Sequence, residues 1–129
     1  MKQLLINLPV ENVESSKVFF EKIGLTFNKE LTDENATCFN IDENIVIALL
    51  PSEHFKAAVN NTVLIDATKV NEMLLSIGVN SNEEVDTFFN KAIEAGGKDK
   101  GKPTDYGSVY GATFSDLDGH LWNIFHMVK

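Results

Sequence analysis

The chain has few of the residues that would indicate a disulfide framework, a nucleic-acid partner or a membrane span. It contains one cysteine, Cys38, so it cannot form an internal disulfide, and this favours a reducing environment. It has 11 Lys and Arg residues against 19 Asp and Glu residues, whereas nucleic-acid binding depends on clustered Lys and Arg. No apolar run approaches the ~20 residues of a membrane span, and the N-terminal apolar stretch is too short for a signal peptide. We therefore expect a cytoplasmic protein that binds neither nucleic acid nor membrane.

Groups suited to catalysis are also scarce. The only histidines are His54, His120 and His126, and no Ser or Cys stands at a recognisable nucleophile–base spacing from any of them. We expect His120 to shape a turn, His126 to face a helix or solvent, and His54 to be exposed. Asp116 and Asp118 flank the same turn, so their pairing favours turn formation over acid–base catalysis. The sequence contains no glycine-rich phosphate loop.

What the chain does contain is an internal repeat. Phe19-Phe20 and Phe88-Phe89 stand 69 residues apart, and each pair is preceded by an apolar segment and followed by glycine. The length of 129 residues and the 43% apolar composition fit one domain with a sizeable core. The repeat therefore predicts one domain built from two similar halves. We place module 1 at about residues 1–59, a crossover at about 60–72 and module 2 at about 73–129.

Apolar periodicity predicts a β-α-β-β-β order in each half. Asn12 is a plausible helix cap, and Asp118-Gly119 is a strong hairpin signal. The predicted strands span about residues 3–10, 25–31, 36–41, 44–50, 73–79, 108–116 and 121–127, the helices about 13–23, 51–59 and 82–95, and a long loop about 99–105.

Each predicted half has one helix that can cover one face of its sheet. The residues Leu5, Asn7, Leu74 and Ser76 fall on the other face, because side chains alternate along a strand. An α+β fold in which two βαβββ modules form a half-barrel around a cavity would give this face a role. On the helix side, we expect Trp122 to be buried with a partner for its indole N–H. We expect Cys38, in a predicted strand, to act as a small buried hydrophobe.

Two segments resemble the vicinal oxygen chelate superfamily, which includes glyoxalase I, bleomycin-resistance proteins and extradiol dioxygenases. They are Leu8-Pro9-Val10 with the following helix to Leu25, and Ser115-Asp116-Leu117-Asp118-Gly119-His120-Leu121-Trp122. The segment from Asp105 to Gly111 resembles a glyoxalase-like subgroup. The repeat also matches the paired βαβββ modules of this superfamily, so the resemblance covers nearly the whole chain.

The resemblance implies a divalent metal in those members that depend on one, held by His, Glu or related donors. Carried over to this chain, the expected ligand positions are Leu5, Leu74, Asn123 and a position at or next to Leu49. Leucine has no donor atom, and an Asn amide is a weak neutral ligand. We therefore expect no metal site and no cofactor.

We expect a binding cavity that has apolar walls with a few polar groups, which suits a small aromatic or amphipathic ligand. The resemblance to bleomycin-resistance proteins, together with acidic residues at the rim, implies that a cationic ligand would be favoured. Asp105 and Tyr106 border the predicted loop and are further candidates for ligand contact. The residues expected to line the cavity are Leu5, Asn7, Phe39, Leu49, Leu74, Ser76, Tyr110 and Asn123.

Three functions stay open at this point. The first is a metal-free small-molecule-binding protein, of the kind that sequesters its ligand. The second is a glyoxalase-like lyase or isomerase, or a dioxygenase, with a metal held elsewhere or with acid–base chemistry through Tyr106, Tyr110, Asp105 or His54. The third is a dimer scaffold without a ligand. The resemblance also implies a homodimer, and the cavity would lie within one chain or between two.

Overall fold

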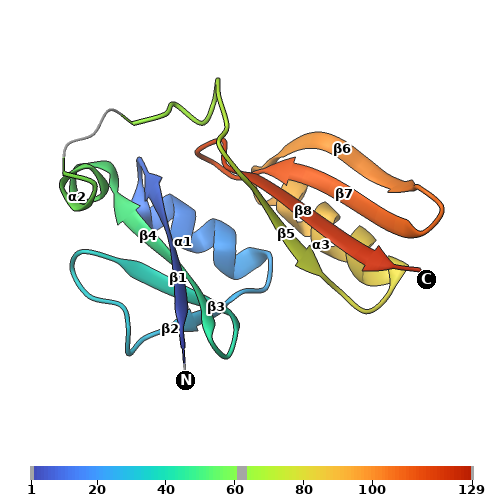
Figure 1. Ribbon diagram of the computed structural model, residues 1–129, viewed down its shortest axis with the longest axis horizontal. Helices are drawn as coiled ribbons and strands as arrows, with labels where there is room; N and C mark the ends of the chain where they lie inside the picture. The colour runs from blue at the N-terminus through green and yellow to red at the C-terminus, as the bar shows by residue number, and fades with distance from the viewer. Residues whose placement is uncertain (1, 61–63, 129) are drawn as a thin grey trace. The chain divides into compact units, whose positions relative to one another are not determined.

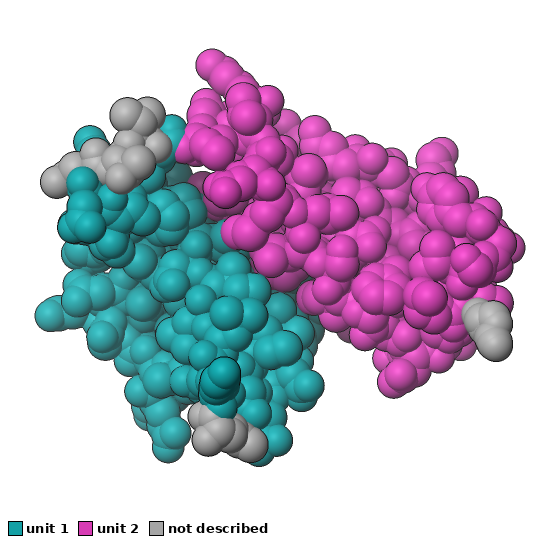
Figure 2. All heavy atoms as spheres, viewed as in Figure 1, with its two compact units in different colours: residues 1–64 teal, residues 65–129 magenta. Residues whose placement is uncertain are grey.

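The structure is a computed structural model that describes residues 2–60 and 64–128 of the chain. The chain divides into two compact units, residues 1–64 and residues 65–129, which Figure 2 shows in different colours. Part of the predicted crossover, residues 61–63, lies outside the described residues. No helix in the described ranges is long and apolar enough to cross a membrane.

Unit 1 is a four-stranded sheet in the order β1-β4-β3-β2, with β1 parallel to β4 and the other pairs antiparallel. Helix α1 lies against one face of this sheet, and the short helix α2 follows β4 (Figure 1). The elements are β1 (Leu4–Val10), α1 (Val13–Lys22), β2 (Thr26–Asn28), β3 (Thr37–Asp42), β4 (Ile45–Pro51) and α2 (Ser52–Ala58).

Unit 2 repeats this arrangement. Its sheet has the order β5-β8-β7-β6, again with one parallel pair, β5 with β8, and antiparallel pairs for the rest. Helix α3 lies against one face of the sheet (Figure 1). The elements are β5 (Leu74–Gly78), α3 (Asn82–Glu94), β6 (Lys98–Asp105), β7 (Val109–Ser115) and β8 (Leu121–Met127). Two tandem βαβββ modules are therefore present, as the sequence predicts.

Both long helices begin at the kind of residue that satisfies their first N–H groups. The Asn12 side chain accepts a hydrogen bond from the Ser15 backbone N–H at 2.9 Å, which confirms Asn12 as the cap of α1. At α3, Ser81 accepts from the Glu84 N–H at 3.1 Å while the Glu84 carboxylate accepts from the Asn80 N–H at 2.7 Å. This arrangement resembles a capping box, except that the glutamate accepts from the N–H of the residue before the cap and not from the cap itself. The two hydrogen bonds fix the start of α3.

The prediction of a loop at residues 99–105 is wrong, because the structure has strand β6 (Lys98–Asp105) there. The segment Lys98–Asp105 has no apolar alternation, so no periodicity marks it as a strand. It pairs only with β7, and its register shifts twice, between Asp99 and Gly101 and between Gly101 and Thr104. An edge strand with bulges, proline and lysine needs no apolar face, and such features discourage pairing with another chain.

Aromatic side chains bind each helix to its sheet. In unit 1 the ring of Phe20 on α1 lies 6.1 Å from the ring of Phe39 on β3, and both residues are buried. In unit 2 the ring of Phe88 on α3 stacks 6.2 Å from Phe114 on β7, and Phe114 stacks on Trp122 of β8. These contacts show which face of each sheet the long helix covers. The opposite face of each sheet is called its second face below.

The turn between β7 and β8 is organised by one buried carboxylate, that of Asp116. It accepts from the backbone N–H groups of Asp118 and His120, each at 3.0 Å, and from the indole N–H of Trp122 at 3.0 Å. Burial raises the pKa of Asp116, while the His120 side chain, the indole and the two backbone donors act in the opposite direction. The predicted turn role of Asp116 and the predicted buried, partnered Trp122 are both confirmed.

A second buried cluster of unit 1 contains Cys38, Val46, Ala48 and Leu50, with Phe55 of α2 packed against it. The thiol lies 3.6 Å from the Leu31 carbonyl oxygen. Burial, and after it the charge of Asp33, raises the pKa of Cys38. The thiol is therefore a buried apolar group that stays protonated, as the sequence predicts.

The Asp116 turn gives a stability prediction. Asp116→Ala removes the acceptor of three donors and leaves the buried indole N–H without one, so we expect the free energy of unfolding to fall by about 2–4 kcal/mol. Asp116→Asn keeps one acceptor oxygen and should lose less. Urea denaturation followed by Trp122 fluorescence measures both. Glu94→Gln, an exposed carboxylate at the end of α3, is the control. Equal stability of Asp116→Ala and the wild type would contradict this account.

The Cys38 environment gives a reactivity prediction. We expect Ellman's reagent to modify Cys38 at least about tenfold more slowly in the native protein than in urea, because burial blocks access and disfavours the thiolate. The absorbance of released thionitrobenzoate reports the rate. A native rate that matches the unfolded rate would show that this cluster opens readily or that the thiol is accessible.

Candidate functional site

The second face of the unit 1 sheet contains Leu5 and Asn7 on β1. Leu5 pairs with Val46 and Asn7 pairs with Ala48, and paired residues share a face. Leu5 is 39% exposed and Asn7 is exposed, whereas Val46 and Ala48 are buried in the cluster described above. The predicted placement of Leu5 and Asn7 opposite the helix is therefore correct.

The second face of the unit 2 sheet contains Leu74 and Ser76 on β5, together with Asn123 on β8. Leu74 pairs with Leu121, and Ser76 pairs with Asn123. The Asn123 amide nitrogen lies 3.4 Å from the Ser76 hydroxyl, and its oxygen lies 3.4 Å from the Thr113 hydroxyl of β7. Three uncharged polar side chains thus form a row across three neighbouring strands.

One aromatic side chain lies next to this row. Phe125 is two residues beyond Asn123 on β8 and pairs with Gly78 on one side and Gly111 on the other. A Cβ atom built on Gly78 would lie 3.1 Å from Cζ of the Phe125 ring, and one built on Gly111 would lie 3.5 Å from the Cβ of Phe125. The Phe125 ring therefore lies close to the backbone of β5, in space that the side chain of a larger residue at position 78 would occupy.

Three of the predicted lining residues lie on the wrong face for that role. Phe39 pairs with Ile47 and packs on Phe20, and Leu49 has the same parity as Ile47, so both are buried beneath α1. Tyr110 pairs with His126 and reaches α3. The expectation that these three share a face with Leu5 and Asn123 is wrong, because a shift of one residue along a strand moves a side chain to the opposite face.

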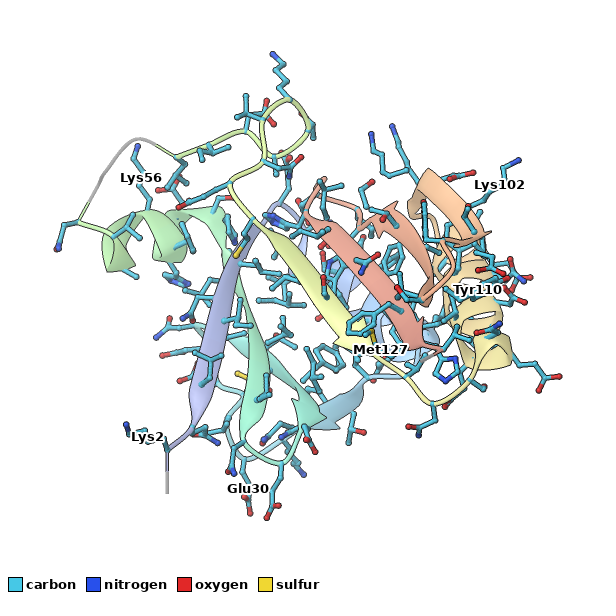
Figure 3. The ribbon with its side chains drawn as sticks, turned by 45° about the vertical axis from the view of Figure 1, so that its right-hand side comes forward. Lys2, Glu30, Lys56, Lys102, Tyr110 and Met127 are labelled. Carbon is cyan, nitrogen blue, oxygen red and sulfur yellow. The ribbon has the colours of Figure 1, made fainter. Side chains whose placement is uncertain are left out.

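The Tyr110 hydroxyl donates a 2.7 Å hydrogen bond to the Asp86 carboxylate of α3. Figure 3 labels Tyr110 on β7 beside this helix. The bond to Asp86, followed by partial burial and the charges of Asp86 and Asp105, raises the pKa of Tyr110. Asp105 pairs with Tyr110 and so lies on the helix side, while Tyr106 is in the following turn and is 67% exposed. The three residues do not meet on a second face.

Of the three histidines, His126 is the one that lies in a strand, and it is on the helix side of its sheet. His126 shares the face of Tyr110, and its Nδ1 lies 2.9 Å from the Asn82 side-chain oxygen at the start of α3. This confirms the prediction that it faces the helix. His54 is exposed on α2, and the backbone N–H of His120 donates to Asp116 in the turn.

The positions that the resemblance assigns to metal ligands hold no strong donors. The pairing places Ala48, next to Leu49, on the same face as Leu5, and it places Asn123 on the same face as Leu74. The four residues supply three hydrocarbon side chains and one neutral amide, which do not fit a divalent ion. Within residues 2–60 and 64–128, no three His, Cys, Asp or Glu side chains are grouped so that they would hold a metal ion.

Sequence reasoning missed Thr113 and Phe125, which the structure places beside Asn123. The signal was present in the sequence, since Phe125 has the same strand parity as Asn123. The cross-strand neighbour Thr113 depends on the β7–β8 register, which the alternation of β7 alone does not fix.

Comparison with known proteins agrees with this architecture. Residues 2–124 match the family model of the Glyoxalase/Bleomycin resistance protein/Dioxygenase superfamily. Hypothetical protein SA1046 from S. aureus has a similar structure, with a TM-score of 0.84 and 32% sequence identity, over 98% of this chain and 94% of its own. No curated protein matches the chain.

Two further solved structures are similar at 16% identity, which shows a shared fold alone. One is a glyoxalase/bleomycin resistance protein/dioxygenase family enzyme from Burkholderia phytofirmans PsJN, with a TM-score of 0.82 over 99% of this chain and 100% of its own. The other is TnmS3, an antibiotic binding protein from Streptomyces sp. CB03234, with a TM-score of 0.65 over 98% and 96%. From the family model, the relative at 32% identity and the two βαβββ modules, the chain belongs to the Glyoxalase/Bleomycin resistance protein/Dioxygenase superfamily.

Proposed function

We propose that this protein binds a small organic molecule on the second faces of its sheets and does so without the metal that many enzymes of its superfamily use. The observation behind the proposal is the set of residues at the positions expected to hold metal ligands. These are Leu5, Ala48, Leu74 and Asn123.

The chemistry of these side chains supports binding over metal catalysis. A divalent ion must exchange most of its bound water for nitrogen, oxygen or sulfur ligands. Leucine and alanine cannot replace water, and one amide oxygen leaves the ion far short of its usual ligand number. Leu5, Leu74 and Asn123 are at least partly exposed and suit an organic ligand, because binding sites for such molecules combine apolar surface with a few polar groups.

The contacts of two acid–base candidates support binding over metal-free catalysis. The hydroxyl of Tyr110 is bonded to Asp86, and this interaction raises its pKa, so the phenol is a poor base. Asp105 shares the helix-side face with Tyr110, so neither group is placed on a second face. The other two candidates, Tyr106 in the turn after β6 and His54 on α2, are exposed.

The family supplies a related precedent. One similar structure is named as an antibiotic binding protein, and its 16% identity to this chain indicates the shared fold. A small-molecule ligand for the present chain is therefore inferred from its own second faces, with the neighbour as a parallel case. We further propose that the protein is a cytoplasmic homodimer, supported by its single buried cysteine and by apolar side chains such as Leu4 and Met73 that are about half exposed.

Native mass spectrometry tests the metal and dimer parts of the proposal. We expect untagged protein, purified without chelator, to give the mass of two chains with no bound divalent ion. A stoichiometric ion in each chain would contradict the argument from Leu5, Leu74 and Asn123. A mass of one chain across the micromolar range would contradict the dimer while leaving the metal result intact.

Thermal unfolding in the presence of a library of antibiotics and metabolites tests ligand binding. A compound at 100 times its Kd stabilises the folded protein by about 2.7 kcal/mol, which corresponds to a rise in Tm of several degrees. We expect at least one compound to raise Tm equally with and without EDTA. A rise that EDTA abolishes would favour a metal-dependent site, and the absence of any rise would favour the scaffold alternative.

A further inference from the structure

The hydrogen bonds of the polar row in unit 2 leave donors available. Thr113 donates to the Asn123 oxygen, and the Asn123 amide nitrogen donates to Ser76, each over 3.4 Å. An amide nitrogen has two hydrogens, and a serine hydroxyl also has one to donate. Within the described residues, the second amide hydrogen of Asn123 and the Ser76 hydroxyl hydrogen donate to no protein acceptor. The row can therefore donate to an acceptor on a ligand.

The two bonds in the row are long for hydrogen bonds, so they hold the side chains only weakly. Ser76 is exposed and Asn123 is half-buried, which makes both accessible from the second face. A ligand oxygen placed over the row would gain shorter bonds from groups that are already aligned by neighbouring strands.

The charge on this face argues against a cationic ligand. The paired positions of the second face in unit 2 hold no Asp or Glu, and the acidic residues of β6, Asp99 and Asp105, pair on the helix side. Among the paired positions of this face, Lys98, which pairs with Ser115, is charged. A cation that lost water here would have no counter-charge, and burying an unpaired charge is costly. On this face of unit 2 the charges therefore favour a neutral molecule over the cation that the resemblance implies.

Phe125 adds an aromatic surface at a fixed distance from the row. Its ring lies over Gly78, and Asn123 is two residues earlier on the same strand, a separation of about 7 Å. Aromatic rings stack face to face with an offset, and such pairs contribute beyond the area that they bury. If the ring of a flat ligand stacks on Phe125, a substituent of that ring can reach Asn123.

We propose that the second face of unit 2 selects a neutral aromatic ligand with a hydrogen-bond acceptor, its ring on Phe125 and its acceptor at Ser76, Asn123 and Thr113. This inference rests on the proposed small-molecule function and adds the class of ligand. Asn123 and Ser76 determine specificity for the acceptor, and Phe125 provides affinity for the ring.

The test uses four naphthalene probes of similar size: methyl naphthyl ketone, ethylnaphthalene, naphthoate and trimethyl(naphthyl)ammonium. Fluorescence titration or calorimetry gives the Kd of each for the full chain. We expect the ketone to bind about tenfold more tightly than ethylnaphthalene, the equivalent of one added hydrogen bond, and more tightly than both charged probes.

Two variants separate the contributions of the row and the ring. Asn123→Leu should remove the preference for the ketone and leave ethylnaphthalene binding unchanged or stronger. Phe125→Leu should weaken both neutral probes. Asn90→Leu makes the same chemical change as Asn123→Leu at an exposed position of α3, on the other layer of unit 2, and should leave every Kd unchanged.

The outcomes distinguish this inference from the proposed function. Equal binding of ketone and ethylnaphthalene, or tightest binding of either charged probe, would overturn the selectivity while binding itself stands. Retention of the ketone preference in Asn123→Leu would overturn the role of the row. Failure of the wild type to bind any of the four probes would overturn the inference, whereas the proposed function would be overturned by the absence of any Tm rise across the library.

Discussion

The alternation of strand side chains, with a single long helix packed on each sheet, is the constraint on which the rest of this structure depends. Each helix buries one face through aromatic contacts, Phe20 with Phe39 in unit 1 and Phe88 with Phe114 in unit 2. Side chains of the opposite parity must then find another role. In unit 2 this division separates the residues buried beneath α3 from those on the opposite face, and Asn123 falls between the buried Trp122 and Ile124 for that reason.

The sequence predicted those features that follow from local rules or from the repeat. The 69-residue spacing between Leu5 and Leu74 placed the first strands of both modules, because two similar sequences fold into similar units. Asn12 and the turn beside Gly119 follow from side-chain capping and from a positive φ of 91° that glycine adopts without strain. Trp122 was expected beneath a helix because its parity matches that of Ile124. These predictions need no knowledge of strand pairing.

The predictions that failed depend on how the strands pair. The spacing between the modules grows from 69 residues at β1 and β5 to 75 residues at β4 and β8, where Ala48 corresponds to Asn123. A register that is uncertain by one residue cannot separate Ala48 from Leu49, and the two point to opposite faces. Phe39 and Tyr110 failed for the same reason. Strand β6 failed differently, since Lys98–Asp105 lacks an apolar pattern and is defined by its backbone pairing with β7.

The amide at Asn123 explains why this face suits an organic molecule. A carboxylate at this position would accept from both neighbouring hydroxyls and would keep a negative charge for an ion to neutralise. An amide instead accepts from Thr113 and donates to Ser76, and no charge remains. Leu74, on the same face of unit 2, changes the surroundings in the same direction, since it puts apolar surface where a metal ligand is expected. The lack of charge and the apolar surface of Leu74 together lower the cost of removing water from this face, and that favours an uncharged ligand over an ion.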